Sequence, residues 1–164
     1  MATLTTAQAA GLVSLSRDIH SHPELAYQER HALGAIADFL ERAGHHVERG
    51  IGGLETAFRA RVGPVDGPAV ALLAEYDALP DVGHGCGHNL IAISNIGAFL
   101  VAAASAARLE VAVELIGTPA EENGGGKIDL LRKRIFDRVL AALSSHPAGQ
   151  GGWAVSGPRS GPTA

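Results

Sequence analysis

Apolar residues recur at helical spacing in two stretches near the start of the chain. The first stretch predicts a helix that begins at a Thr5 or Thr6 cap and ends before Pro23, which disfavours helical geometry at the preceding residue. The second predicts a helix over residues 27–43, closed by Gly44 in the usual C-terminal position. The apolar positions of the two stripes are Leu12, Leu15, Ile19, Leu33, Ile36, Ala37 and Leu40.

Further along, the pattern changes to short runs that are typical of β-strands. Residues 56–62 alternate loosely, as expected of a strand with one more polar face, whereas residues 69–74 are continuously apolar, as in a central strand covered on both sides. Between the strands, the pattern predicts an apolar helix from a cap at Asn89 to Arg108 and a short helix over 124–134. Alternating helices and strands indicate an α/β layered fold. The expected strands are 46–49, 56–62, 69–76, 110–117 and 139–143.

The composition indicates a packed globular protein and restricts its partners. Hydrophobic residues make up 46% of the chain, and the mean hydropathy is +0.14. Thirteen Lys and Arg stand against seventeen Asp and Glu without a long basic run, which argues against nucleic acid as a partner. We also expect no membrane partner and a soluble, cytoplasmic protein. No apolar run reaches the roughly 18 to 20 residues that span a bilayer, and the N-terminus lacks a secretory signal pattern.

The end of the chain differs from the rest. Residues 149–164 are rich in Gly, Pro and Ser and show no periodicity. We interpret them as a flexible or aberrant tail that follows a domain of residues 1–148.

Candidate metal ligands gather after the apolar strand expected at 69–76. Asp77 stands just past its end, where α/β folds usually place their sites. Cys86 and His88 are two residues apart, so an extended loop would turn both side chains to one side, and the neighbouring glycines would leave room for an ion. Thiolate and imidazole together suit zinc or a similar divalent metal. The same stretch also contains Glu75, Asp81 and His84.

Two plainer interpretations of Cys86 remain open. It could be an incidental thiol in a glycine-rich turn, although the density of potential ligands argues against that. It could also be a redox thiol, but the chain has no second cysteine to resolve an oxidised form.

A second candidate cluster, Glu121 and Glu122, follows the strand expected at 110–117. Two adjacent carboxylates can divide the work, one binding a metal and the other accepting a proton from water. The pair could equally be a solvated acidic loop. The glycines at 124–126 could cradle a phosphate, but two carboxylates would repel it and the P-loop ending is absent. His146, before Pro147, is by itself more typical of a surface turn.

The three clusters, in this order and spacing, resemble the M20 family of metallopeptidases, in particular its amidohydrolase-like branch and the aminoacylase-like dipeptidase subgroup. The resemblance implies a three-layer α/β/α catalytic domain with a mixed sheet that binds two divalent ions, often zinc, manganese or cobalt. The stretches that carry it are His22-Pro-Glu-Leu25, Glu75-Tyr-Asp-Ala-Leu-Pro80, Gly85-Cys-Gly-His-Asn89 and Thr118-Pro-Ala-Glu-Glu122.

The resemblance also implies a role for each site residue. It assigns the metal ligands, Glu121 as the general base that later protonates the leaving amine, and Asp77 as a residue that orients a ligand. The implied substrate is a small amide, such as a dipeptide or an N-acyl amino acid, and full-length relatives are often homo-oligomeric. The implied metal ligands are Cys86, His88, Glu122 and His146.

The chain is much shorter than complete members of that family. Those members insert a lid or dimerisation domain after this region and supply one more metal-binding histidine later in the chain. We therefore expect residues 1–148 to be the N-terminal part of a catalytic domain. The alternative is an inactive fragment that binds metal weakly at most.

Overall fold

The computed structural model describes residues 2–147, and the tail predicted at 149–164 lies outside them. Helices and strands alternate along these residues, as the hydrophobic pattern predicted, and most boundaries lie within three residues of those expected. The elements are α1 (Thr6–Ser21), α2 (Arg30–Arg42), β1 (Glu48–Arg49), η1 (Ile51–Gly53), β2 (Phe58–Val62), β3 (Ala69–Ala74), α3 (His88–Ala103), η2 (Ala106–Arg108), β4 (Ala112–Gly117), α4 (Gly126–Arg132) and β5 (Val139–Leu143).

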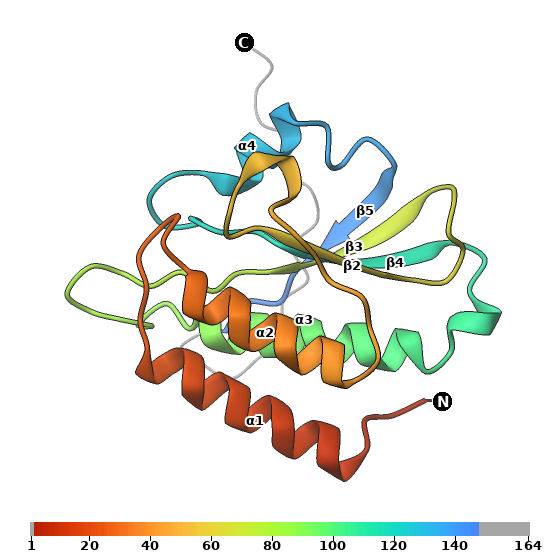
Figure 1. The fold of residues 1–164 in the computed structure, drawn as a ribbon, viewed down its shortest axis with the longest axis horizontal. Helices are drawn as coiled ribbons and strands as arrows, with labels where there is room; N and C mark the ends of the chain where they lie inside the picture. Colours follow the sequence, from red (N-terminus) through yellow and green to blue (C-terminus); the bar gives the residue numbers. More distant parts are fainter. Residues whose placement is uncertain (1, 148–164) are drawn as a thin grey trace.

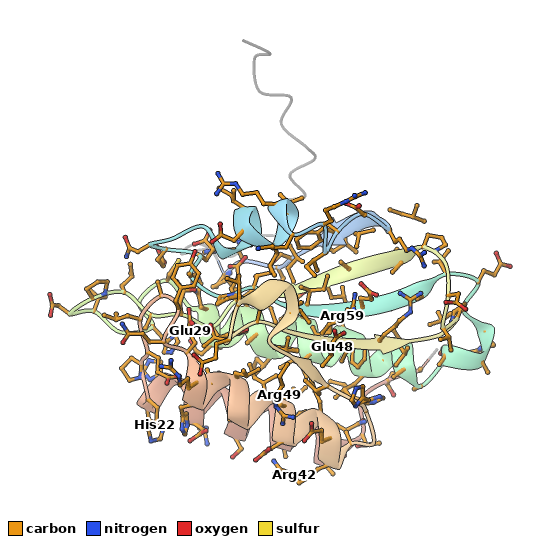
Figure 2. All side chains as sticks on the ribbon, turned by 45° about the horizontal axis from the view of Figure 1, so that its top comes forward. His22, Glu29, Arg42, Glu48, Arg49 and Arg59 are labelled. Carbon is orange, nitrogen blue, oxygen red and sulfur yellow. The ribbon has the colours of Figure 1, made fainter. Side chains whose placement is uncertain are left out.

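The strands form one mixed sheet in the order β1-β2-β4-β3-β5. β3 pairs in parallel with both β4 and β5, whereas β2 runs antiparallel to β4 and to β1. Crossovers through α3 and α4 connect the three parallel strands, so their carboxyl ends meet at one edge of the sheet. On the outer part of the sheet, Arg59 of β2 donates to Glu48 of β1, and the two side chains lie next to one another in Figure 2.

Helices cover both faces of the sheet, which confirms the predicted α/β layered fold. Helices α1, α2 and α3 lie on one side and α4 on the other (Figure 1). The larger apolar core includes Leu72 and Leu115 and faces the three helices, while Ala71 and Ile116 belong to a smaller core beneath α4. Since neighbouring residues of β3 and β4 enter opposite cores, both strands are buried on two faces, as the continuous apolar run of β3 predicted.

The helix ends agree with the sequence in one place and differ in another. Thr5 caps α1 through a capping box with Gln8, in which each side chain accepts from the other residue's backbone N–H. The predicted cap at Asn89 is wrong. Gly87 precedes α3 in the left-handed conformation, and the side chain of Asn89 instead donates to Ser16 of α1. The predicted helix also ends earlier, at Ala103, and is followed by the short turn η2.

Within residues 2–147, no helix combines the length and the apolar character that crossing a membrane would need.

Candidate metal centre

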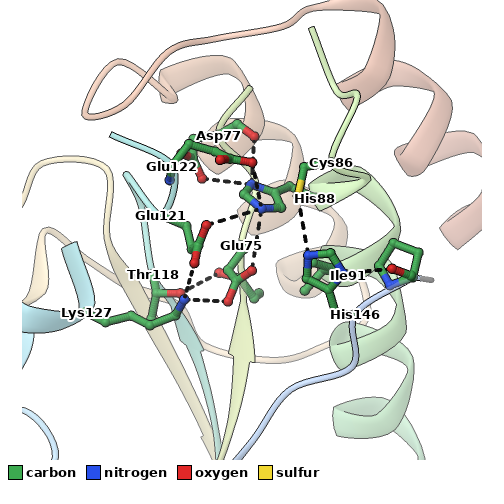
Figure 3. A network of polar contacts seen from close by, with 12 residues as sticks. Glu75, Asp77, Cys86, His88, Ile91, Thr118, Glu121, Glu122, Lys127 and His146 are labelled. Atoms are coloured by element: carbon green, nitrogen blue, oxygen red, sulfur yellow. Dashed lines mark hydrogen bonds and ion pairs between the residues drawn. The ribbon is translucent and has the colours of Figure 1, made fainter. Parts of the chain in front are cut away.

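The parallel strands bring the predicted clusters together at one edge of the sheet. β3 is followed by Glu75 and Asp77, β4 by the loop that carries Glu121 and Glu122, and β5 by His146. Cys86 and His88 join them from the start of α3 (Figure 3). Strand topology thus places residues that are up to 71 positions apart in the sequence around one point.

His88 lies at the centre of the cluster and is fully buried. Its Nδ1 lies 3.0 Å from Oδ1 of Asp77 and 2.9 Å from the backbone oxygen of the same residue. Burial disfavours the charged ring, but this hydrogen bond and the nearby carboxylates outweigh it and raise the pKa of His88. With the Nδ1 proton held by Asp77, Nε2 is the nitrogen that faces the remaining carboxylates.

Asp77 is buried and connects His88 to the loop after β4. Burial would raise its pKa, but the hydrogen bonds from His88 and from the backbone N–H of Glu122 lower it below the usual value. The Glu122 N–H lies 2.9 Å from Oδ2 of Asp77. The carboxylate therefore orients the imidazole with one oxygen and the acidic loop with the other.

Three carboxylates face Nε2 of His88 without bonding to it. Oxygens of Glu75, Glu121 and Glu122 each lie 3.7 Å from this nitrogen, beyond hydrogen-bond distance. Nε2 and Oε1 of Glu122 are buried and have no hydrogen-bond partner within the described part of the chain. Buried polar atoms are nearly always paired. An arrangement of imidazole and carboxylates around unpaired buried atoms fits a divalent cation.

Cys86 and His146 form the other side of the cluster. The Sγ atom of Cys86 lies 3.3 Å from Nε2 of His146, and both residues lie within ligand distance of His88. Burial and the hydrogen bond to Glu122 raise the pKa of the Cys86 thiol to about 11. Without an ion the sulfur is therefore protonated near neutrality, and binding a metal as a thiolate requires the loss of that proton.

Lys127 is a site residue that sequence reasoning missed, since it was weighed only as a phosphate ligand. It is the second residue of α4, and its Nζ lies 2.6 Å from the buried carboxylate of Glu75 and 3.7 Å from Glu121. Glu75 was noted only as one of several possible ligands. The signal available in the sequence was the position of Lys127, directly after the glycines that follow the glutamate pair.

Other histidines lie outside this cluster. His84 is buried next to His20 of α1, and burial lowers its pKa. A separate group at the surface joins Asp18, His22 and His31, in which Asp18 lies 2.9 Å from Nε2 of His31. These residues therefore belong to other parts of the structure.

Comparison with known proteins identifies relatives that share this chemistry. No model of a known protein family matches the chain. It is 44% identical over 153 residues to the Xaa-Arg dipeptidase of Mus musculus, which covers 85% of the chain and 36% of the relative. It is also 37% identical over 155 residues to a polypeptide of the p-aminobenzoyl-glutamate hydrolase of Escherichia coli, covering 81% of the chain and 31% of the relative.

Among solved structures, the chain is similar to a dinuclear metal binding peptidase of the M20 family from Bacillus subtilis. The TM-score is 0.76 at 30% sequence identity, and the match covers 85% of this chain and 43% of the peptidase. The chain thus spans about a third of the length of the curated relatives that it matches.

Proposed function

Because the chain belongs to the M20 family over the residues that it shares with these relatives, we propose that it carries a large part of the active site of a metal-dependent amide hydrolase. The observation that carries the proposal is the buried Nε2 of His88, which faces three carboxylates at 3.7 Å and has no hydrogen-bond partner among the described residues. The proposed metal ligands are Cys86, His88, Glu122 and His146.

Each residue of the site has a definable part in such a reaction. A divalent ion at this position, with a second beside it, supplies Lewis-acid polarisation of the amide carbonyl and lowers the pKa of water. Glu121, whose side chain is 39% exposed, takes a proton from the attacking water and delivers it to the leaving amine. Asp77 holds the Nδ1 proton of His88 and leaves the Nε2 lone pair free. Lys127 offsets the charge of Glu75.

The proposed substrates are dipeptides and N-acyl amino acids. The names of the relatives include a dipeptidase for Xaa-Arg substrates and a hydrolase for p-aminobenzoyl-glutamate, and both of these substrates contain an amide bond. We propose zinc, manganese or cobalt as the ion, because thiolate, imidazole and carboxylate together suit borderline metals.

Removing the proton acceptor while keeping the metal tests the proposal. The chain is stripped with a chelator, reloaded with Zn²⁺, Mn²⁺ or Co²⁺, and assayed with Xaa-Arg dipeptides, N-acyl amino acids and p-aminobenzoyl-glutamate. We expect metal-dependent hydrolysis that Glu121→Gln reduces by about 10²- to 10⁴-fold. Metal content should stay unchanged in this variant, and Glu110→Gln, at an exposed carboxylate, serves as the matched control.

Two outcomes would contradict the proposal in different ways. Metal binding no stronger than in a Cys86→Ser variant would contradict the metal centre. Tight metal binding without hydrolysis would instead favour the alternative that the chain binds metal but does not turn over. That alternative is supported by the share of the relatives' length that the chain spans, about a third.

A further inference from the structure

The loop that carries the two glutamates follows a backbone path that its own sequence disfavours. This acidic loop comprises residues 118–125, and Ala120 within it has a φ of +57°, in the left-handed region that residues with side chains rarely adopt. The carbonyl of Ala120 accepts from the backbone N–H of Gly125 at 2.8 Å and of Gly126 at 3.3 Å. A Cβ atom at Gly126 would collide with the carbonyl oxygen of Pro119. Such a conformation persists only where the surroundings hold it.

Glu29 holds the first half of the acidic loop. It precedes α2, where Figure 2 labels it, and is fully buried. Its Oε1 accepts the backbone N–H of Ala120 at 2.8 Å and that of Tyr27 at 3.0 Å. The strained residue directly before Glu121 is therefore tied to a side chain 91 positions earlier in the chain.

Tyr27 holds the second half of the same loop. Its hydroxyl lies 3.0 Å from the carbonyl oxygen of Gly124 and 2.7 Å from Asp129 of α4. Its ring packs so closely on Gly124 that a Cβ there would lie 2.5 Å from the ring. Tyr27 itself has a φ of +63°, so the segment before α2 is also held in an unusual conformation.

These contacts bracket the two glutamates. Glu121 has no side-chain hydrogen bond within residues 2–147, and its ion-pair distances, to His88 and Lys127, are both 3.7 Å. Its orientation therefore depends on the path of the loop backbone. Glu122 is tied in addition by its N–H to Asp77.

We propose that Tyr27 and Glu29 form a positioning clamp that fixes where the carboxylates of Glu121 and Glu122 stand relative to His88. The clamp acts through the backbone at Ala120 and Gly124, on either side of the pair. This inference deepens the proposed function, on which it rests for the roles of the two glutamates.

Hydrogen exchange of the metal-free chain tests the clamp without reference to metal or activity. Tyr27→Phe keeps the ring and removes the hydroxyl, and we expect amides of residues 118–126 to exchange about tenfold faster, as for the loss of a hydrogen bond. Tyr76→Phe is the matched control, because it removes a buried hydroxyl that bonds Thr56 and does not bond the loop. Amides of α3 should be unchanged in both variants.

A second pair of variants separates the hydrogen bond of Glu29 from its volume. Glu29→Gln keeps an oxygen that can accept from Ala120, so exchange in the loop should stay near that of the unmodified chain. Glu29→Met has similar size but no acceptor, so the loop should exchange about tenfold faster or more. Rescue by the conservative variant would assign the effect to the hydrogen bond.

Binding of Co²⁺ then shows whether the clamp positions metal ligands. Absorption by a cobalt–thiolate bond reports binding at Cys86, which lies outside the acidic loop. We expect Tyr27→Phe to weaken Co²⁺ binding by about tenfold, as for other residues that orient metal ligands, while the absorption at saturation is retained. Tyr76→Phe should leave the affinity unchanged.

The two measurements distinguish failure of the clamp from failure of the proposed function. Unchanged loop exchange in both Tyr27→Phe and Glu29→Met would overturn the clamp. Faster exchange with unchanged Co²⁺ affinity would reduce Tyr27 and Glu29 to a structural role and overturn their positioning role. If the unmodified chain binds no Co²⁺, the proposed function fails, and the exchange data alone decide whether the clamp exists.

Discussion

The side chain of Asp77 has two acceptor oxygens, and the structure uses each for a different purpose. One binds the Nδ1–H of His88, and the other binds the backbone N–H of Glu122. An imidazole held in this way presents Nε2 with a fixed direction and tautomer. Partners of this kind commonly contribute about 10- to 100-fold to metal affinity.

Replacing Asp77 should therefore weaken metal binding without removing a proposed ligand. In Asp77→Asn, the amide nitrogen cannot accept, so one of the two hydrogen bonds is lost together with the negative charge. We expect Zn²⁺ affinity to fall by about 10- to 100-fold, measured by competition with a chromophoric chelator. Asp66→Asn, at an exposed carboxylate in a turn, should bind Zn²⁺ as the unmodified chain does. Equal affinity in the two variants would contradict this role of Asp77.

A pH dependence of stability follows from His45, which the sequence placed at the surface. The structure instead places its ring half-buried against Phe99, and burial lowers its pKa. Because the unfolded chain then binds the proton more readily, this histidine contributes stability above its unfolded pKa of about 6.5 that is lost as the pH falls. Between pH 7 and 5, His45→Gln should thus lose less of its free energy of unfolding than the unmodified chain, by urea denaturation.

The neighbouring residue provides the control for that measurement. His46 is exposed, so His46→Gln should follow the same pH curve as the unmodified chain. Parallel curves for His45→Gln and His46→Gln would contradict the effect of burial.

Single residues also show how far the sequence alone could predict the site. Cys86 and His88 form a local motif, so their proximity followed from spacing. Lys127 and Glu29 could not be found in this way, because their contacts join residues 52 and 91 positions apart. Only the order of strands in the sheet brings such residues together.

Among the elements, the helices and strands were predicted well where one face is apolar and the other is not. The exception is the start of α3, which is apolar nearly all round and therefore has no polar face to mark its first residue. There Asn89 was assigned as the cap, whereas it lies inside the helix and bonds Ser16 across the interface with α1. A tertiary hydrogen bond thus outweighed the local preference of asparagine for caps.

The start of α1 supports a prediction at this scale. Thr5 accepts from the N–H of Gln8, and the side chain of Gln8 accepts in return from the N–H of Thr5. Thr5→Ala removes the first of these bonds, so the free energy of unfolding in urea should fall by about 1 kcal/mol. Thr3→Ala, just outside the helix, should change it by less than about 0.5 kcal/mol. A similar loss in both variants would show that the capping box is not the cause.

The molecule as a whole concentrates negative charge at one edge of its sheet. Four carboxylates, from Glu75, Asp77, Glu121 and Glu122, surround His88, and Lys127 is the one lysine or arginine that contacts them within residues 2–147. Like charges in a partly buried site repel one another and destabilise the fold. A divalent ion at this edge would relieve that repulsion and satisfy the unpaired atoms of His88 and Glu122.

Metal should therefore stabilise the folded chain, and the size of the effect can be stated. An ion that binds only the folded state adds about 2.7 kcal/mol to the free energy of unfolding when its free concentration is about 100 times its Kd. Urea denaturation with and without Zn²⁺ measures this gain, which Cys86→Ser should largely remove. The surface group of Asp18, His22 and His31 provides the control, since His31→Ala should keep the gain. The reverse result, with the gain lost in His31→Ala and kept in Cys86→Ser, would locate the stabilising ion at the surface. The unpaired atoms beneath the sheet edge would then need another explanation.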